Sequence, residues 1–261
     1  MTENLEQKKN RLFVVLSGIF LTNAILAEMI GVKIFSGEGT LGLPPAELSI
    51  LGFTMDFNLT AGAVIWPVVF ITSDLINEYF GKPGVKRISY LAAFFIAYCF
   101  LVVFFTMRLP PAAWWLEANN QDLQGNFFNI DFAFNKIFGQ GQRIIIGSLS
   151  AFLISQLVDV FVFQKLRKIT GHKMLWLRAT GSTLVSQFID SFVVLYIAFI
   201  GIFSGQQILA IGITNYIYKF TVAILLTPLI YLGHYFIDRY LGKEHAQKIS
   251  EEAAQGSQSF F

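Results

Sequence analysis

Hydrophobic residues are grouped in long runs along the chain, and short polar segments separate these runs. A helix needs about 20 mostly apolar residues to cross the hydrocarbon layer of a membrane. The runs are continuous and do not alternate between apolar and polar positions, so they do not favour a β-barrel. The pattern predicts six transmembrane helices, over residues 12–35, 58–80, 88–108, 143–164, 177–202 and 207–237.

The composition excludes most classes of soluble protein. Of the 261 residues, 54% are hydrophobic and only 14% are charged, whereas soluble domains have about 25% charged residues. The one cysteine, Cys99, has no partner with which to form a disulfide, and a net charge of +2 does not indicate nucleic-acid binding. We therefore expect an all-α membrane protein that forms a compact helix bundle without a cofactor or a metal site.

The distribution of positive charge predicts how the chain is oriented. Of its 19 lysines and arginines, 14 lie in the N-tail, the second loop, the fourth loop and the C-tail, and 3 lie in the remaining loops. Cytoplasmic loops of membrane proteins are enriched in lysine and arginine, so both termini are expected in the cytoplasm. The expected organisation is a cytoplasmic N-tail over 1–11, a six-helix transmembrane domain over 12–237, and a cytoplasmic C-tail over 238–261, which is polar and expected to be loose after Tyr240.

Two segments of the long outer loop combine aromatic and polar residues. Residues 109–116 contain two prolines and two tryptophans, and residues 126–139 contain five phenylalanines among Asn, Asp and Lys. This mixture is typical of the lipid headgroup layer, so both segments are expected to form interfacial helices. An anchoring belt is favoured over a lid above an outward-facing cavity, because aromatic residues are common at membrane interfaces.

Charged residues inside the predicted spans are informative because each one costs at least about 2.5 kcal/mol at the membrane centre. Five acids and two lysines lie there: Glu28, Asp74, Glu78, Asp159 and Asp190, with Lys33 and Lys219. The acids outnumber the lysines, so some are expected to be protonated, hydrated, paired with an arginine at a helix end, or available to a cationic ligand. Glu78 and Arg178 lie near helix ends, where side chains are expected to reach the membrane surface.

A five-residue motif, Ser-Gln-x-x-Asp, occurs twice, at residues 155–159 and 186–190 in consecutive spans. Both Ser-Gln pairs fall near the middle of the membrane. Polar residues at this depth often serve only to join helices, and an ion pair between Lys219 and Asp190 would also be purely structural. A polar cluster from four helices nevertheless favours a binding site, formed by Asn23, Gln156, Gln187, Asp190 and Lys219.

The order of these motifs is similar to that of a known family. Besides the repeated motif, the chain has Ser-Asp-Leu-Ile-Asn-Glu-Tyr-Phe-Gly at 73–81, Ala-Phe-Ile-Gly at 198–201, and Tyr218-Lys219 followed by Pro228. The chain resembles the queuosine precursor transporters, also called the vitamin uptake transporter family, over most of its length. The resemblance implies an importer in the cell inner membrane that carries 7-deazaguanines for tRNA modification by alternating access. The implied substrates are 7-cyano-7-deazaguanine, its aminomethyl relative or queuine.

The chemistry of the candidate residues fits such a base. A deazaguanine has two N–H donors beside a carbonyl, so a carboxylate can accept from both donors while an amide or ammonium donates to the carbonyl. Asp190 or Asp159 is expected to bind the donor edge, and Lys219 is either the carbonyl donor or a counter-ion. Amide side chains would orient the base and aromatic rings would stack on it. The full substrate-binding set is Asn23, Asp74, Glu78, Gln156, Asp159, Gln187, Phe188, Asp190, Tyr218 and Lys219.

Two other functions serve as alternatives. The nearest is the substrate-binding subunit of an ATPase-driven importer of the energy-coupling-factor type, whose ATPase would be another chain. An enzyme is not expected, because Ser204 and His234 could act as a serine–histidine pair only if they met, and they fall on opposite sides of the membrane. The expected partners are a purine-like small molecule and the lipid bilayer, with no nucleic acid. A homodimer is left open.

Overall fold

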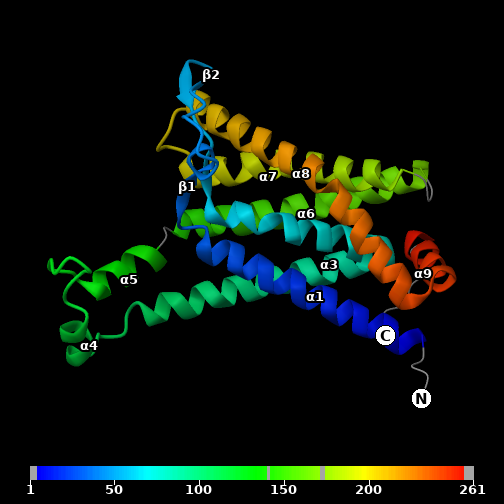
Figure 1. The fold of residues 1–261 in the computed structure, drawn as a ribbon, viewed down its shortest axis with the longest axis horizontal. Coiled ribbons are helices and arrows are strands. Elements are labelled where there is room, and N and C mark those ends of the chain that lie inside the picture. The colour runs from blue at the N-terminus through cyan, green and yellow to red at the C-terminus, as the bar shows by residue number, and fades with distance from the viewer. Residues whose placement is uncertain (1–4, 140–141, 171–173, 256–261) are drawn as a thin grey trace.

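The computed structural model describes residues 5–139, 142–170 and 174–255, and most of them are helical. Within these residues, five helices are long and apolar enough to cross a membrane: α1 (Leu5–Ile30), α3 (Trp66–Thr106), α6 (Gln142–Thr170), α7 (Leu175–Phe199) and α8 (Gly205–Leu241). Figure 1 shows them side by side, with short strands at one end of the bundle and α9 (Lys243–Gln255) at the other. The prediction of a mostly helical bundle suited to a membrane is confirmed.

The helix α3 contains most of two predicted spans, 58–80 and 88–108, which join near Gly81. A straight helix of its 41 residues would be about 60 Å long, twice the hydrocarbon thickness of a membrane. The backbone of Gly81 is not helical, with φ 63° and ψ −169°, and Figure 1 shows α3 reaching the α9 end of the bundle and then returning. Glycine adopts this φ readily, and a Cβ atom here would lie 2.7 Å from the carbonyl oxygen of Ala253 in α9. The chain therefore has a glycine where it both turns and passes close to another backbone.

The segment between α1 and α3 forms two antiparallel strand pairs, one nested inside the other. The strand β1 pairs with β4 and β2 pairs with β3, and the turn between β2 and β3 consists of Leu51 and Gly52. Both turn residues have positive φ, as two-residue hairpin turns often require. The structure thus adds strands to the all-α class that the sequence predicted. The elements are β1 (Ile34–Ser36), α2 (Gly37–Thr40), β2 (Leu48–Ile50), β3 (Phe53–Met55), β4 (Asn58–Thr60) and the 3-10 turn η1 (Ala61–Val64).

The carboxylate of Glu38 holds this strand-containing segment together. Its Oε1 accepts hydrogen bonds from the backbone N–H of Phe57 over 2.7 Å and of Ala46 over 3.3 Å, and its Oε2 accepts from Ser36 Oγ over 3.1 Å. These bonds, with that from Phe57 the most important, lower the pKa of Glu38 below its usual value. A charged Glu38 is therefore part of the folded form of the segment.

Both aromatic segments of the long outer loop contain a helix, namely α4 (Ala113–Ala118) and α5 (Ile130–Phe138). Asn129 caps α5, because its side chain accepts a hydrogen bond from the backbone N–H of Phe132 over 2.9 Å. In Figure 1 the two short helices extend away from the bundle beyond the end of α3. Their position in the lipid headgroup layer stays a prediction.

The expectation that the tail after Tyr240 is loose was wrong for its first part. Residues 243–255 form α9, which packs against α3 and α8, and bury Ala246, Ile249 and Ala253. These residues are spaced three and four apart, so they share one face of the helix. The apolar stripe is short and is interrupted by many polar residues, which is why composition alone suggested an unstructured tail.

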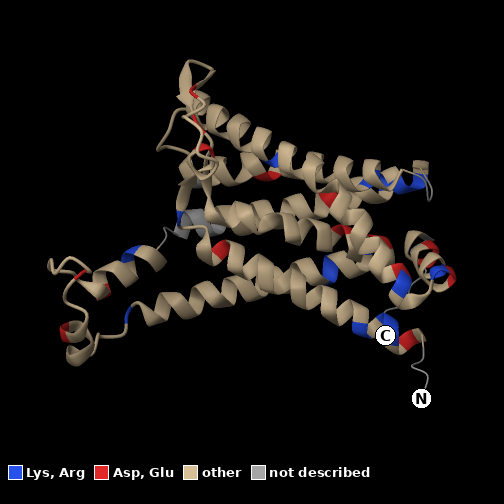
Figure 2. Ribbon diagram, viewed as in Figure 1, with Lys and Arg blue, Asp and Glu red and all other residues tan. Residues whose placement is uncertain are grey.

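Positive charge is concentrated at one end of the bundle. Figure 2 shows most lysines and arginines at the end that holds α9 and the beginning of α1, and few at the end that holds the strands. The charged segments identified in the sequence therefore gather on the same side of the molecule. This arrangement agrees with the predicted orientation, which places that side in the cytoplasm.

Candidate functional site

A cavity lies between α3, α7 and α8, and its empty volume is about 550 Å³ when the part open to the outside is included. Trp66, Phe70 and Asp74 line it from α3 and are spaced four residues apart, so one face of that helix forms a wall. The other helices contribute faces in the same way. Thr180, Thr183 and Gln187 come from α7, and Tyr218, Lys219, Val222, Ala223, Leu226 and Ile230 come from α8.

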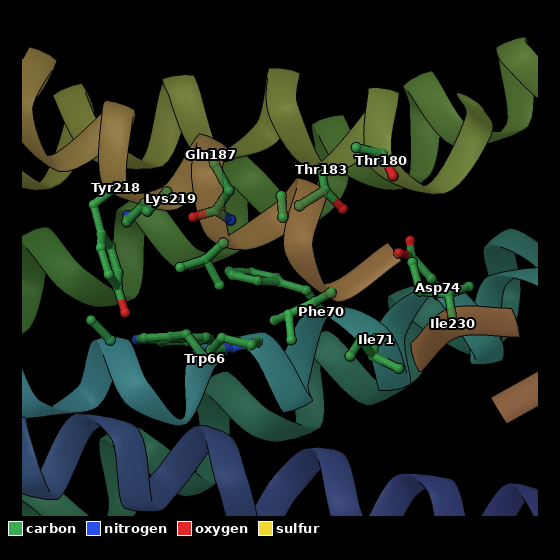
Figure 3. A pocket seen from close by; sticks show the side chains of 15 residues that line it. Trp66, Phe70, Ile71, Asp74, Thr180, Thr183, Gln187, Tyr218, Lys219 and Ile230 are labelled. Carbon is green, nitrogen blue, oxygen red and sulfur yellow. The ribbon is translucent and has the colours of Figure 1, made fainter. Parts of the chain in front are cut away.

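Aromatic rings form part of the cavity wall. The rings of Trp66 and Phe70 are stacked, with centroids 5.7 Å apart and an angle of 17° between their planes. In the view of Figure 3, Tyr218 stands above Trp66 from the side of α8. Flat apolar surfaces of this kind favour a planar, aromatic ligand.

Gln187 presents a complete hydrogen-bonding group to the cavity. Its side chain is 2% exposed, and neither its amide nitrogen nor its amide oxygen has a hydrogen-bond partner among the described residues. Figure 3 shows Gln187 on the cavity wall between Lys219 and Thr183. Each buried polar atom without a partner costs about 1–3 kcal/mol, so Gln187 is well suited to a ligand that supplies both a donor and an acceptor.

Asp74 lies at the other end of the cavity from Tyr218 in Figure 3. It is 2% exposed, and its Oδ1 has no hydrogen-bond partner within the described part of the chain. Glu78 follows it by one turn in the same helix. None of the ion pairs found between described residues includes Asp74. The cavity therefore ends at a buried carboxyl group that pairs with no cation of the described residues.

Lys219 and Asp190 form the ion pair that the sequence suggested. Lys219 Nζ lies 2.5 Å from Asp190 Oδ2, and each side chain is 22% exposed. Lys219 lines the cavity, whereas Asp190 does not. The lysine can therefore face a ligand while the aspartate behind it fixes its position.

The two copies of the Ser-Gln-x-x-Asp motif lie in the same region, but their glutamines and aspartates make different contacts. In α6, Gln156 Oε1 accepts a hydrogen bond from Ser73 Oγ over 3.0 Å. Asp159 Oδ1 accepts one from Ser186 Oγ of the second copy over 3.1 Å. Neither Gln156 nor Asp159 lines the cavity, although both are buried beside it. Gln187, in the second copy, faces the cavity itself.

Two predicted residues lie away from the cavity. The side chain of Asn23 donates to the backbone oxygen of Ile19 over 2.8 Å, within its own helix. Phe188 is 50% exposed, and its ring packs against Phe192 and Tyr216. The structure does not bring either side chain to the cavity wall.

Trp66 and Phe70, together with Thr180 and Thr183, were missed by sequence reasoning. The spacing Trp66, Phe70, Asp74 puts both rings on the helix face of a predicted site residue. That signal was available in the sequence. It is hidden by the large number of aromatic residues elsewhere in the chain.

Glu78 and Arg178 are buried inside the protein, so the expectation that their side chains extend outward to the membrane surface was wrong. Arg178 donates to the two carboxylate oxygens of Glu78 over 3.0 and 2.8 Å, and both side chains are buried. Arg167 lies 3.3 Å from the same carboxylate, and Ser250 Oγ donates to it over 2.9 Å. We call Glu78, Arg167, Arg178 and Ser250 the inner cluster. The inner cluster joins α3, α6, α7 and α9. These helix ends were expected to be exposed, because the sequence did not indicate that α9 covers them.

The structure also separates Ser204 from His234. Ser204 caps the beginning of α8, where its Oγ accepts the backbone N–H of Gln207. His234 lies near the other end of the same helix, about 45 Å along its axis, and its Nδ1 is 2.8 Å from the hydroxyl of Tyr79. A serine–histidine pair between them is excluded by this distance.

Comparisons with known proteins bear on the same residues. The family model described as "Putative vitamin uptake transporter" matches residues 60–233. The chain belongs to this family. All residues that line the cavity fall within the matched region, whereas α9 lies beyond it. With its several membrane-spanning helices, this member of a transporter family is a multi-pass membrane protein.

The individual relatives that match the chain are named as queuosine precursor transporters. The chain is 31% identical over 219 residues to the "Probable queuosine precursor transporter" of Bacillus subtilis (strain 168), covering 80% of this chain and 90% of that one. It is 29% identical over 184 residues to the "Queuosine precursor transporter" of Escherichia coli (strain K12), covering 68% and 72%. No solved structure matches the chain. The resemblance seen in the sequence motifs is confirmed.

Proposed function

We propose that this protein imports queuosine precursors across the cell inner membrane and binds the 7-deazaguanine base in the cavity between α3, α7 and α8. The observation that carries the proposal is the buried amide of Gln187, with both polar atoms unpaired, beside the stacked rings of Trp66 and Phe70. A purine-like base has a planar ring for the aromatic wall and adjacent donors and acceptors for the amide. The names of the relatives support the same substrate class.

The positions of the charged groups suggest how the base is held. Asp74 replaces Asp159 and Asp190 as the acid that accepts the two N–H donors of the base, because it alone of the three lines the cavity. Lys219 donates to the carbonyl from the wall formed by α8. Asp159 and Gln156 act from behind the wall, where they fix Ser186 and Ser73.

We further propose that the chain crosses the membrane six times with both termini in the cytoplasm. The two halves of α3 account for the second and third crossings, since its backbone turns at Gly81. The concentration of lysine and arginine at the α9 end supports this orientation (Figure 2). Alternating access then requires the inner cluster to separate when the cavity opens to the cytoplasm.

Complementation of a cell that cannot make the precursor tests the proposal. Queuosine in tRNA is measured at low external 7-cyano-7-deazaguanine, 7-aminomethyl-7-deazaguanine or queuine, with and without the protein. We expect restoration by the wild type and its loss in Gln187→Leu at equal membrane levels. Phe188→Ala, a change in the neighbouring residue outside the cavity, is the matched control and should restore queuosine. Failure with all three bases would reject the substrate class.

Uptake by the purified protein in liposomes distinguishes a self-sufficient carrier from a subunit. We expect uptake by the protein alone. Uptake that appears only when an ATPase chain is supplied would instead assign the protein to the energy-coupling-factor type.

A further inference from the structure

The amide of Gln187 lies beside Lys219 on the wall of the cavity. Gln187 precedes Asp190 by three residues in α7, so the two side chains are neighbours on one side of that helix. Asp190 in turn holds Lys219 of α8 through their ion pair of 2.5 Å. Figure 3 shows Gln187 on the wall between Lys219 and Thr183. A ligand atom that meets Lys219 therefore has the Gln187 amide as its neighbour.

No protein group fixes which end of the Gln187 amide faces the ligand. The side chain is 2% exposed, and Nε2 and Oε1 both lack a hydrogen-bond partner among the described residues. Asp74, which also lines the cavity with an unpaired buried oxygen, offers only acceptors when it is ionised. Gln187 instead needs both an acceptor for its N–H groups and a donor for its carbonyl oxygen, side by side on the ligand.

The substituent on C7 of the base is the ligand group that reaches this amide. In a 7-deazaguanine, the carbonyl group lies between the N–H donors on one side and the C7 substituent on the other. When the donors meet Asp74 and the carbonyl meets Lys219, the substituent follows next beyond the carbonyl. It then points away from the Asp74 end of the cavity, toward the wall that holds Gln187 (Figure 3).

We propose that Gln187 determines which 7-substituent the protein accepts, and that it selects an aminomethyl group over a cyano group. The inference rests on the proposed function, since it places the same base in the same cavity. An aminomethyl group puts a donor beside the carbonyl acceptor, so Gln187 Nε2 donates to the carbonyl while Oε1 accepts from the ammonium. A cyano group puts a second acceptor there and leaves Oε1 buried without a partner.

The charges of the cavity wall also suit a cationic substituent. Lys219 is paired with Asp190, so the ammonium meets no uncompensated positive charge beside Gln187. Asp74 pairs with no cation of the described residues. An ionised Asp74 and the ammonium therefore leave the loaded cavity without net charge. The cyano base would leave the negative charge of Asp74 unbalanced, and a net charge inside a membrane is costly.

Equilibrium binding by the purified full chain in detergent tests the inference at pH 7, where the aminomethyl group is protonated. The wild type should bind 7-aminomethyl-7-deazaguanine at least about fivefold more tightly than 7-cyano-7-deazaguanine, which corresponds to the smallest cost expected for one buried polar atom without a partner. Unsubstituted 7-deazaguanine is the reference. The aminomethyl base should bind more tightly than this reference, and the cyano base should not.

Two substitutions of Gln187 should change this preference in opposite directions. Gln187→Glu offers only acceptors, so the preference for the aminomethyl base, measured as the ratio of the two dissociation constants, should rise by about fivefold or more. Gln187→Met has a similar length but no amide, so the same ratio should fall by a similar factor. Gln206→Glu makes the matched change at an exposed position in the first turn of α8 and should leave the ratio unchanged.

The wild type alone can reject the inference, so the outcome does not depend on the folding of a variant. Equal or tighter binding of the cyano base by the wild type would overturn it. A ratio that is the same in Gln187→Glu, Gln187→Met and the wild type would also overturn it, because another group would then set the preference. Binding of all three bases without preference rejects the inference alone, whereas binding of none of them rejects the proposed function with it.

Discussion

The hydroxyl of Ser250 in α9 donates a hydrogen bond to Oε1 of Glu78 in α3 over 2.9 Å. Arg167 of α6 donates to both the backbone oxygen and Oγ of the same serine. The C-terminal helix is thus bonded to the buried ions of the bundle, and Ser250 is one residue through which it reaches them. This contact predicts that α9 contributes to the stability of the transmembrane helices.

Replacing Ser250 with alanine should lower the stability of the protein by about 1–3 kcal/mol, because it removes one hydrogen bond from each of the buried charged groups of Glu78 and Arg167. The measurement is thermal unfolding of the purified protein in detergent. Gln247→Ala is the control, since Gln247 is exposed on the same helix and should change stability by less than about 0.5 kcal/mol. Equal effects of the two substitutions would contradict the prediction.

Glu78→Gln should lower the free energy of unfolding by about 3–5 kcal/mol, more than Ser250→Ala, because it removes the negative charge that pairs with the buried Arg167 and Arg178. The folded fraction after extraction, measured by size-exclusion chromatography, reports this loss. The double substitution Glu78→Met with Arg178→Met should be milder than the sum of the two single ones. Strict additivity would show that the two residues do not act as a pair.

Trp66→Ala should weaken binding of the base by about tenfold or more, because stacking contributes about 0.5–1.5 kcal/mol beyond the area that the ring buries. Trp66→Phe should recover most of the affinity. The dissociation constant in detergent measures both. Trp114→Ala, which removes a tryptophan that is 71% exposed in α4, serves as the control and should bind normally.

The segment around Glu38 should loosen in acid. The pKa of Glu38 is lowered in the folded protein by the hydrogen bond from Phe57, so its stabilising effect is complete above the ordinary pKa of 4.5 and is lost as the pH falls through the lowered value. The protection of the backbone amides of residues 34–60 against hydrogen exchange should therefore fall between pH 6 and pH 3. In Glu38→Gln the segment should exchange faster at pH 6 and depend less on pH. Glu47→Gln, at an exposed site nearby, should behave as the wild type does.

The sequence predicted the long helices well because an apolar run of membrane length has few other stable forms. The pair between Lys219 and Asp190, which the sequence offered as a structural alternative to a binding site, is present, since two opposite charges at the same depth attract each other. The surroundings of Glu78 were predicted only in part. An acid paired with an arginine at a helix end was among the expectations, and Arg178 provides that pair. The hydrogen bond from Ser250 was not predictable in this way, because it joins residues 172 positions apart through a helix that the sequence did not indicate.

The candidate site was predicted in part. Asp74, Gln187, Tyr218 and Lys219 line the cavity, but Asn23 and Phe188 do not. Depth in the membrane can be counted from the sequence, whereas the direction in which a helix faces depends on its neighbours. Phe188 follows Gln187 by one position, so it points about 100° away and outward.

The uninterrupted part of α3 before Gly81 links the cavity to the inner cluster mechanically. Residues 66–80 form one continuous helical segment that carries Trp66, Phe70 and Asp74 along its length and Glu78 in its last turn. Because one segment carries both sets of residues, we expect a tilt about Gly81 to change the width of the cavity and the contacts of Glu78 together.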